Sequence, residues 1–198
     1  MKKFKITAIP VIISLLLCTA AGEPEMRSEL LSPPTENKAD ITKDRHTAEI
    51  NFYPKPVFQL GMLGVLQQEK YRGKVLVVDI WGTWCKPCVA QFPHLKAVKA
   101  ALADQEVEYV YFANEIQAPV LENWKKVVNS FNLTGDHYLT GKDQVFQLMK
   151  DIDQYSPRFT YPTYMIVNRE GKVVDHDAPK PSEGDELIKR IREVLAED

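Results

Sequence analysis

The chain has 198 residues, a formal net charge of −2 and 44% hydrophobic residues, which is enough to bury one good core. Nothing in this length and composition indicates a second core. Without the three lysines of the first 17 residues the charge becomes −5 (−2 minus 3), and this acidic balance disfavours nucleic acid as a partner.

The first 17 residues have the pattern of a signal peptide. Three lysines within the first five residues precede an apolar stretch over 6–17, which is too short to span a bilayer as a mature helix. Two outcomes stay open. Residues 15–18 resemble a relaxed bacterial lipobox, which would leave Cys18 lipidated at the new N-terminus; alternatively, ordinary cleavage follows residue 20 or 21. The lipoprotein outcome is favoured because it explains a cysteine where the apolar stretch ends. We therefore expect an exported, extracytoplasmic protein, lipid-anchored on the periplasmic side of a bacterial membrane.

The region between this signal and the first strong strand pattern is polar or irregular. Residues 18–49 are rich in charged and turn-forming residues and predict a flexible tether. Over 50–74, apolar residues are interrupted by prolines and glycines, which is typical of short strands and turns, with one helical turn over 67–71.

The stretch from Val75 to Cys88 carries the predicted chemistry. An apolar, β-branched run over 75–81 predicts a strand, and a glycine-containing turn then leads to Cys85 and Cys88 at the start of a helix. Two cysteines at positions i and i+3 lie on one helical face, so their sulfurs can bond or separate with little backbone movement. The spacing therefore predicts a redox pair, and Cys18 is left for the signal or a lipid.

The two cysteines are expected to differ in role. Unpaired N–H groups at a helix start favour an anion and Lys86 adds a nearby cation, so Cys85 is the expected attacking sulfur. Pro87 suits the first helical turn, where its missing N–H costs nothing. Cys88, one turn further in, is expected to be less exposed and to act as the resolving thiol.

Two other interpretations of the cysteine pair stay open. A structural zinc site needs four ligands, but the chain has no second cysteine pair; His94 could be recruited, while the other histidines are scattered. A static disulfide across so short a loop would restrict the unfolded chain little. The redox interpretation is favoured, and we expect no metal and no cofactor.

Helix and strand patterns alternate along the rest of the chain. We predict one helix over 86–103 that Pro93 kinks, then strands over 107–113 and 136–140 and helices over 119–131 and 143–152. Residues 164–175 predict a hairpin, and Ser182 to Asp185 resemble a capping box before a closing amphipathic helix. This alternation predicts an α/β domain with parallel strands and helices on both faces of the sheet.

The residues that surround the cysteines also resemble a known family. Trp81-Gly-Thr-Trp-Cys-Lys-Pro-Cys88, followed by Phe92-Pro93, resembles the active-site segment of thioredoxin-fold proteins, most closely the TlpA/ResA-like membrane-tethered thiol:disulfide oxidoreductases. The resemblance spans roughly residues 50 to 196, with specific motifs at 75–93 and 158–175. It implies a thioredoxin fold over 50–198, with a central mixed sheet flanked by helices and an N-terminal extension that includes a hairpin within 50–74.

The same resemblance implies a function. It favours a reductant of protein disulfides that is itself reset by an upstream membrane thiol reductant, with cytochrome c biogenesis as a candidate pathway. Two alternatives stay open: a disulfide-forming oxidant of the same fold, and a non-catalytic module that binds peptides or a metal.

Two residues, Asp79 and Gln91, decide which group can take a proton from the resolving cysteine. Asp79 occupies the position of the buried acid that, in thioredoxins, exchanges a proton with the resolving cysteine; its apolar neighbours on the strand indicate burial, which raises the pKa of a carboxyl group. Gln91 stands where many ResA-like proteins carry glutamate. Because a neutral amide cannot act as a base, any proton relay must depend on Asp79 or water.

A second loop is expected to face the disulfide. Tyr161-Pro162-Thr163 matches the thioredoxin loop whose proline is cis, and the backbone of Tyr161 would then pair with a substrate strand. The expected substrate-binding residues are Trp84, Lys86, Pro87, Tyr161 and Pro162.

Overall fold

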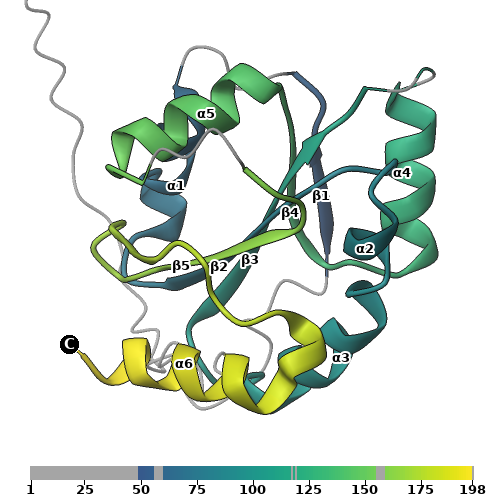
Figure 1. Ribbon diagram of the computed structural model, residues 1–198. Helices are drawn as coiled ribbons and strands as arrows, with labels where there is room; N and C mark the ends of the chain where they lie inside the picture. The colour runs from purple at the N-terminus through teal and green to yellow at the C-terminus, as the bar shows by residue number, and fades with distance from the viewer. Residues whose placement is uncertain (1–48, 56–59, 117, 119, 155–158, 198) are drawn as a thin grey trace, which may run out of the picture. The chain divides into compact units, whose positions relative to one another are not determined.

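The computed structural model describes residues 49–55, 60–116, 118, 120–154 and 159–197. The predicted signal, Cys18 and nearly all of the predicted tether lie outside these residues. Within them, six strands form one sheet in the order β1-β4-β3-β2-β5-β6 (Figure 1). Their bounds are β1 Ile50–Tyr53, β2 Val75–Trp81, β3 Val107–Asn114, β4 Gly135–Thr140, β5 Thr163–Val167 and β6 Val173–Asp175.

The sheet is mixed, as the family resemblance implied. β1, β4, β3 and β2 run parallel to one another, β5 is antiparallel to β2, and β6 is antiparallel to β5. Every residue of β2 is buried, because a strand at the centre of a sheet covered on both faces meets no solvent. The predicted hairpin over 164–175 is confirmed as β5 and β6.

Helices cover both faces of the sheet, which confirms the predicted α/β class. Side chains of β2 alternate between two core clusters, one with α2, α3, α4 and α6 and the other with α1 and α5. Figure 1 shows α1 and α5 together on one side and α3 and α6 together on the other. The helices are α1 Gly61–Leu66, α2 Lys86–Val89, α3 Phe92–Ala101, α4 Val120–Ser130, α5 Lys142–Asp151 and α6 Gly184–Ala196.

The prediction of one kinked helix over 86–103 is wrong. The chain forms α2, leaves the helix at residues 90 and 91, and begins α3 at Phe92. Pro93 is therefore the second residue of a new helix and not an interior kink. Proline has no N–H to donate to the preceding turn, but the first turn of a helix needs no such donor, so the chain restarts there.

The prediction of an N-terminal hairpin within 50–74 is also wrong. β1 pairs in parallel with β4, with Ile50 opposite Gly135, and the described residues that follow form α1 and a 3₁₀ turn at Glu69–Tyr71. This turn confirms the predicted helical turn over 67–71. Phe52 on β1 packs edge-on against Trp124 of α4, with ring centroids 5.0 Å apart. A local hairpin would not bring Phe52 to that apolar contact.

The predicted capping box at the last helix does not form. The backbone N–H of Glu183 instead donates a 2.8 Å hydrogen bond to the Lys180 carbonyl oxygen, which closes a 3₁₀ turn at Pro181–Glu183, and the Glu183 carboxylate accepts a 2.9 Å hydrogen bond from the N–H of Lys180. Because Pro181 starts this turn, Ser182 lies inside it and not at a helix boundary. α6 then begins at Gly184 without a side-chain cap.

Candidate active site

The turn that carries the cysteines joins the end of β2 to the start of α2. Its first residue is Gly82, where a Cβ atom would lie 2.5 Å from Nε1 of Trp84 and 2.7 Å from the carbonyl oxygen of Asn114. Cys85 follows with an extended backbone and is the N-cap residue of α2. The absence of a side chain at Gly82 therefore lets the strand turn closely into the helix.

Cys85 and Cys88 form a disulfide, with their Cα atoms 5.3 Å apart. The backbone N–H of Cys88 donates a 3.3 Å hydrogen bond to Sγ of Cys85. Cys88 is fully buried, whereas 4% of Cys85 is exposed, and the side chains of Lys86 and Pro87 between them face solvent. An N–H donor stabilises a negatively charged sulfur, so in the reduced protein Cys85 is the better placed of the two to carry the thiolate.

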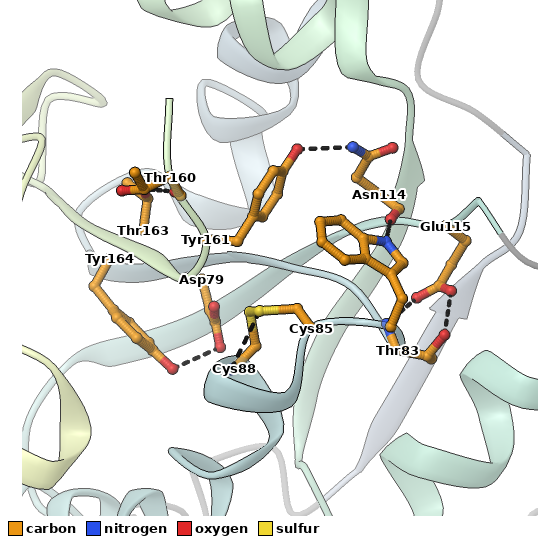
Figure 2. Close-up of a disulfide and its surroundings, with 11 residues drawn as sticks. Asp79, Thr83, Cys85, Cys88, Asn114, Glu115, Thr160, Tyr161, Thr163 and Tyr164 are labelled. Carbon is orange, nitrogen blue, oxygen red and sulfur yellow. Dashed lines mark hydrogen bonds between the residues drawn. A yellow bond between two sulfur atoms is a disulfide. The ribbon is translucent and has the colours of Figure 1, made fainter. Parts of the chain in front are cut away.

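Asp79 lies on β2 and faces the same core cluster as the disulfide. Residues 75, 77 and 81 of the strand alternate onto this face and share the cluster with both cysteines. The carboxyl group is 2% exposed; its Oδ2 accepts a 2.9 Å hydrogen bond from the Tyr164 hydroxyl, and its Oδ1 has no partner among the described residues (Figure 2). Burial raises the pKa of Asp79 to about 8, against the smaller, lowering effect of the Tyr164 hydrogen bond. This carboxyl group can therefore gain or lose a proton near neutral pH.

The loop before β5 contains the predicted cis peptide bond between Tyr161 and Pro162. The Thr163 hydroxyl donates a 2.7 Å hydrogen bond to the Thr160 carbonyl oxygen across this bond. The Tyr161 ring meets the Trp84 ring edge-on, with centroids 5.1 Å apart. The loop and the cysteine turn, which are far apart in the sequence, thus meet through two aromatic rings. Figure 2 shows Tyr161 on the same side of the disulfide as Asn114.

This geometry agrees with the comparison against known families, in which residues 54–194 match the Redoxin family. The chain belongs to the redoxin family. In two solved structures, the thioredoxin domain of a thiol-disulfide oxidoreductase from Bacteroides vulgatus and a thiol-disulfide oxidoreductase from Bacteroides fragilis, the shared fold reaches a TM-score of 0.50. The two structures are 22% and 20% identical to this redoxin. Each match covers 64% of this chain, and it covers 82% and 85% of the respective solved chain. The thioredoxin fold predicted from the sequence is confirmed.

Several curated relatives of this redoxin are named thiol-disulfide oxidoreductase ResA. The protein from Geobacillus thermodenitrificans is 32% identical over 103 residues, which are 52% of this chain and 53% of that protein. The match therefore spans about half the length of each. A Bacillus thuringiensis relative is 24% identical over 165 residues and 83% of each chain.

Three residues of this redoxin beside the disulfide were missed by the sequence analysis. Asn114 is the last residue of β3, Glu115 follows it, and Thr83 lies in the cysteine turn. Hydrogen bonds join Glu115 to Thr83, and Asn114 to both the cysteine turn and the cis-proline loop (Figure 2). A signal for the first two does exist in the sequence. Polar residues directly after a buried parallel strand lie at the edge of the sheet where functional loops gather.

Gln91, which replaces the glutamate common in ResA-like proteins, has a structural contact in this redoxin. Its Oε1 accepts a 2.9 Å hydrogen bond from the backbone N–H of Ser182. His94, the candidate zinc ligand, is exposed on α3. In the part of the chain that the structure describes, no three histidine, cysteine or acidic side chains gather as a metal site would require, and no helix is both long and apolar enough to cross a bilayer.

Proposed function

We propose that this redoxin is an extracytoplasmic thiol-disulfide oxidoreductase that reduces disulfides of proteins. The observation that carries the proposal is the Cys85–Cys88 disulfide, whose outer sulfur is the N-cap of α2 and accepts the N–H of Cys88 while the inner sulfur is fully buried. An outer sulfur that favours the thiolate and an inner one that is shielded from other partners make a pair that attacks first and resolves second.

The first step uses Cys85. Its thiolate attacks one sulfur of a substrate disulfide, forming a new S–S bond and breaking the old one; the displaced substrate sulfur leaves as a thiolate and takes a proton from solvent. The product is a mixed disulfide between Cys85 and the substrate.

The second step uses Cys88 and Asp79. In the ionised fraction of the protein, which grows as pH rises toward 8, the Asp79 carboxylate takes the proton of the Cys88 thiol, and the resulting thiolate attacks Sγ of Cys85. The mixed disulfide breaks, the intramolecular disulfide forms again, and the second substrate sulfur leaves as a thiolate that takes a proton from solvent while Asp79 releases its proton to solvent. The substrate has gained two electrons, which an upstream membrane dithiol must resupply before the next cycle.

We place the substrate over the surface where the cysteine turn meets the cis-proline loop. The rings of Trp84 and Tyr161 contact each other there, Pro162 follows the cis peptide bond of the loop, and Lys86 and Pro87 are exposed between the two cysteines. An extended segment of a substrate protein can add main-chain hydrogen bonds along such a loop. This arrangement supports a protein substrate over a small disulfide.

The cellular location is part of the proposal. The export-signal pattern over residues 1–17 supports an extracytoplasmic protein, and Cys18 supplies the attachment point for a lipid anchor. Disulfides persist outside the cytoplasm, so a dithiol reductant finds substrates there. The resemblance of the cysteine segment to TlpA/ResA-like oxidoreductases favours the reductive direction.

An insulin-reduction assay tests the proposal. The wild-type protein with dithiothreitol is expected to precipitate the insulin B chain well above the dithiothreitol background, and Cys85→Ser is expected to fall to that background. Cys88→Ser is expected to accumulate a mixed disulfide visible on a non-reducing gel, since the first step proceeds and the second cannot. Equal, background-level turnover by the wild type and Cys85→Ser would reject an enzyme.

A further inference from the structure

Two consecutive residues at the end of β3 contact both of the segments that flank the disulfide. Asn114 is the last residue of the strand and is 5% exposed, and Glu115 follows it and is half-buried. Because β3 is the parallel neighbour of β2, its end lies beside the turn in which β2 ends. Figure 2 shows both side chains reaching from this strand end toward the groups around the disulfide.

Glu115 holds the segment that leads into Cys85. Its Oε1 accepts a 2.8 Å hydrogen bond from the backbone N–H of Thr83, and its Oε2 accepts another from the Thr83 hydroxyl. One carboxylate thus binds both the main chain and the side chain of a residue only two positions before the attacking sulfur. Such a two-point contact fixes the turn more closely than either hydrogen bond alone.

Asn114 holds both aromatic rings of the Trp84–Tyr161 contact. Its backbone oxygen accepts a 2.7 Å hydrogen bond from Nε1 of Trp84, and its Nδ2 donates a 2.7 Å hydrogen bond to the Tyr161 hydroxyl. The two rings belong to segments almost eighty residues apart in the sequence, and Asn114 is bonded to each. Only the contact with Tyr161 depends on the asparagine side chain, so mutation can remove it selectively.

We propose that Asn114 and Glu115 are positioning residues for the thiol exchange, with Glu115 setting the turn that carries Cys85 and Asn114 setting the Trp84–Tyr161 contact over which a protein substrate lies. This inference rests on the proposed function. It separates two effects: Glu115 acts on the attacking sulfur and affects every disulfide substrate, whereas the Asn114 side chain acts on the ring contact and affects only substrates large enough to cover it.

The test compares a protein disulfide with a small one, using the full chain. Initial rates are measured with insulin and with bis(2-hydroxyethyl) disulfide. Asn114→Ala is expected to raise KM for insulin about fivefold, as the loss of one hydrogen bond suggests, with kcat and the small-disulfide rate within about twofold of wild type. Tyr161→Phe removes the same hydrogen bond from the other side. The double variant is therefore expected to be no worse than either single variant.

Glu115→Ala is expected to lower kcat/KM about tenfold for both substrates, and Glu115→Gln to recover most of this loss because its amide keeps an acceptor for the Thr83 N–H. Glu122→Ala and Asn129→Ala, on the exposed side of α4, serve as matched controls and are expected to match wild type.

The outcomes separate the two proposals. A wild-type protein that reduces neither substrate rejects the proposed function. An active wild type whose Asn114→Ala variant slows both substrates alike, or whose Glu115→Ala variant slows neither, overturns the positioning roles. Should Asn114→Ala fail to fold, Tyr161→Phe tests the same hydrogen bond; should Glu115→Ala fail to fold, Thr83→Ala removes the hydroxyl that donates to Glu115 and is expected to slow both substrates. The proposal is contradicted if the losses in insulin reduction add up in the double variant Asn114→Ala with Tyr161→Phe. It is also contradicted if Glu115→Gln is as slow as Glu115→Ala.

Discussion

Asp79 is the residue on which the proton chemistry depends, and its surroundings come from the register of the sheet. It lies opposite Tyr164 on β5 and opposite Tyr111 on β3, so a single acid is placed between two tyrosines in one cross-strand row. Burial raises the pKa of both tyrosines, and the charge of Asp79 raises it further. The row therefore favours neutral hydroxyl groups and, for much of the neutral range, a protonated Asp79.

We expect Asp79→Asn to change how the stability of the oxidised protein depends on pH. The folded pKa of Asp79 is about 8, above its ordinary value of 3.8, so between these values the folded protein holds a proton that the unfolded chain has released. This contribution is complete at the acidic end and is lost as pH rises toward 8. The asparagine variant lacks it, so its free energy of unfolding should gain several kcal/mol relative to wild type between about pH 4 and pH 8.

Urea unfolding of both proteins at pH 5 and pH 8.5 provides the measurement. Other titrating groups are common to the two proteins and cancel in the difference. Tyr164→Phe removes the hydrogen bond that lowers the pKa of Asp79, so this variant should keep the slope and extend it to higher pH. A difference between wild type and Asp79→Asn that does not vary with pH would show that the carboxyl group is not desolvated.

At the scale of the elements, the break between α2 and α3 determines what surrounds the cysteines. α2 has four residues and ends at Val89, and α3 begins again three residues later. Gln91 lies in this break and bonds to Ser182 in the 3₁₀ turn before α6. The Gln91 side chain thus joins the helix region that carries the cysteines to the turn before the C-terminal helix. This role needs a hydrogen-bond acceptor and not a base.

Gln91→Ala and Gln91→Glu are expected to separate these requirements. The alanine variant loses the hydrogen bond to the Ser182 N–H, which should lower the free energy of unfolding by roughly 0.5–1 kcal/mol because the contact is near the surface. The glutamate variant keeps an acceptor and should stay near wild type. Denaturant midpoints of the three proteins give the comparison, and a glutamate variant as unstable as the alanine variant would contradict the assignment.

At the scale of the whole described sheet, one acidic residue of β4 adds side-chain hydrogen bonds to the pairing of the edge strand β1. Asp136 accepts hydrogen bonds from Asn51 on β1 at 3.1 Å, from Lys70 at 2.6 Å, and from the hydroxyl of Tyr71, which is itself buried. Burial alone would lower the pKa of Lys70, but its hydrogen bonds to Asp136, Tyr138 and Tyr53 raise it overall. One carboxylate therefore connects three segments that are separate in the sequence.

Asp136→Ala is expected to lower the free energy of unfolding by about 2–3 kcal/mol. The change leaves a buried tyrosine hydroxyl with fewer partners and a lysine without its counter-charge, which costs more than the loss of an exposed ion pair. Asp104→Ala, at an exposed aspartate after α3, controls for the loss of an acid and should change stability by less than about 0.5 kcal/mol. Equal effects of the two substitutions in urea unfolding would refute the structural role of Asp136.

The sequence by itself determined what depends on neighbours along the chain. The apolar run of β2, the spacing of Cys85 and Cys88, and the alternation that gives the β5–β6 hairpin are local patterns, and local geometry reproduces them. The family resemblance added the cis bond at Pro162 and the buried acid at Asp79.

Only the tertiary structure decided which distant segments meet. β1 pairs with β4, Asn114 and Glu115 reach the turn and loop beside the disulfide, and Tyr164 bonds to Asp79. Parallel strands take their partners from far along the chain, and the residue at a strand end has no periodic pattern to mark it. The order and register of the strands therefore set these contacts, through the burial of two apolar faces that no short stretch of sequence can cover alone.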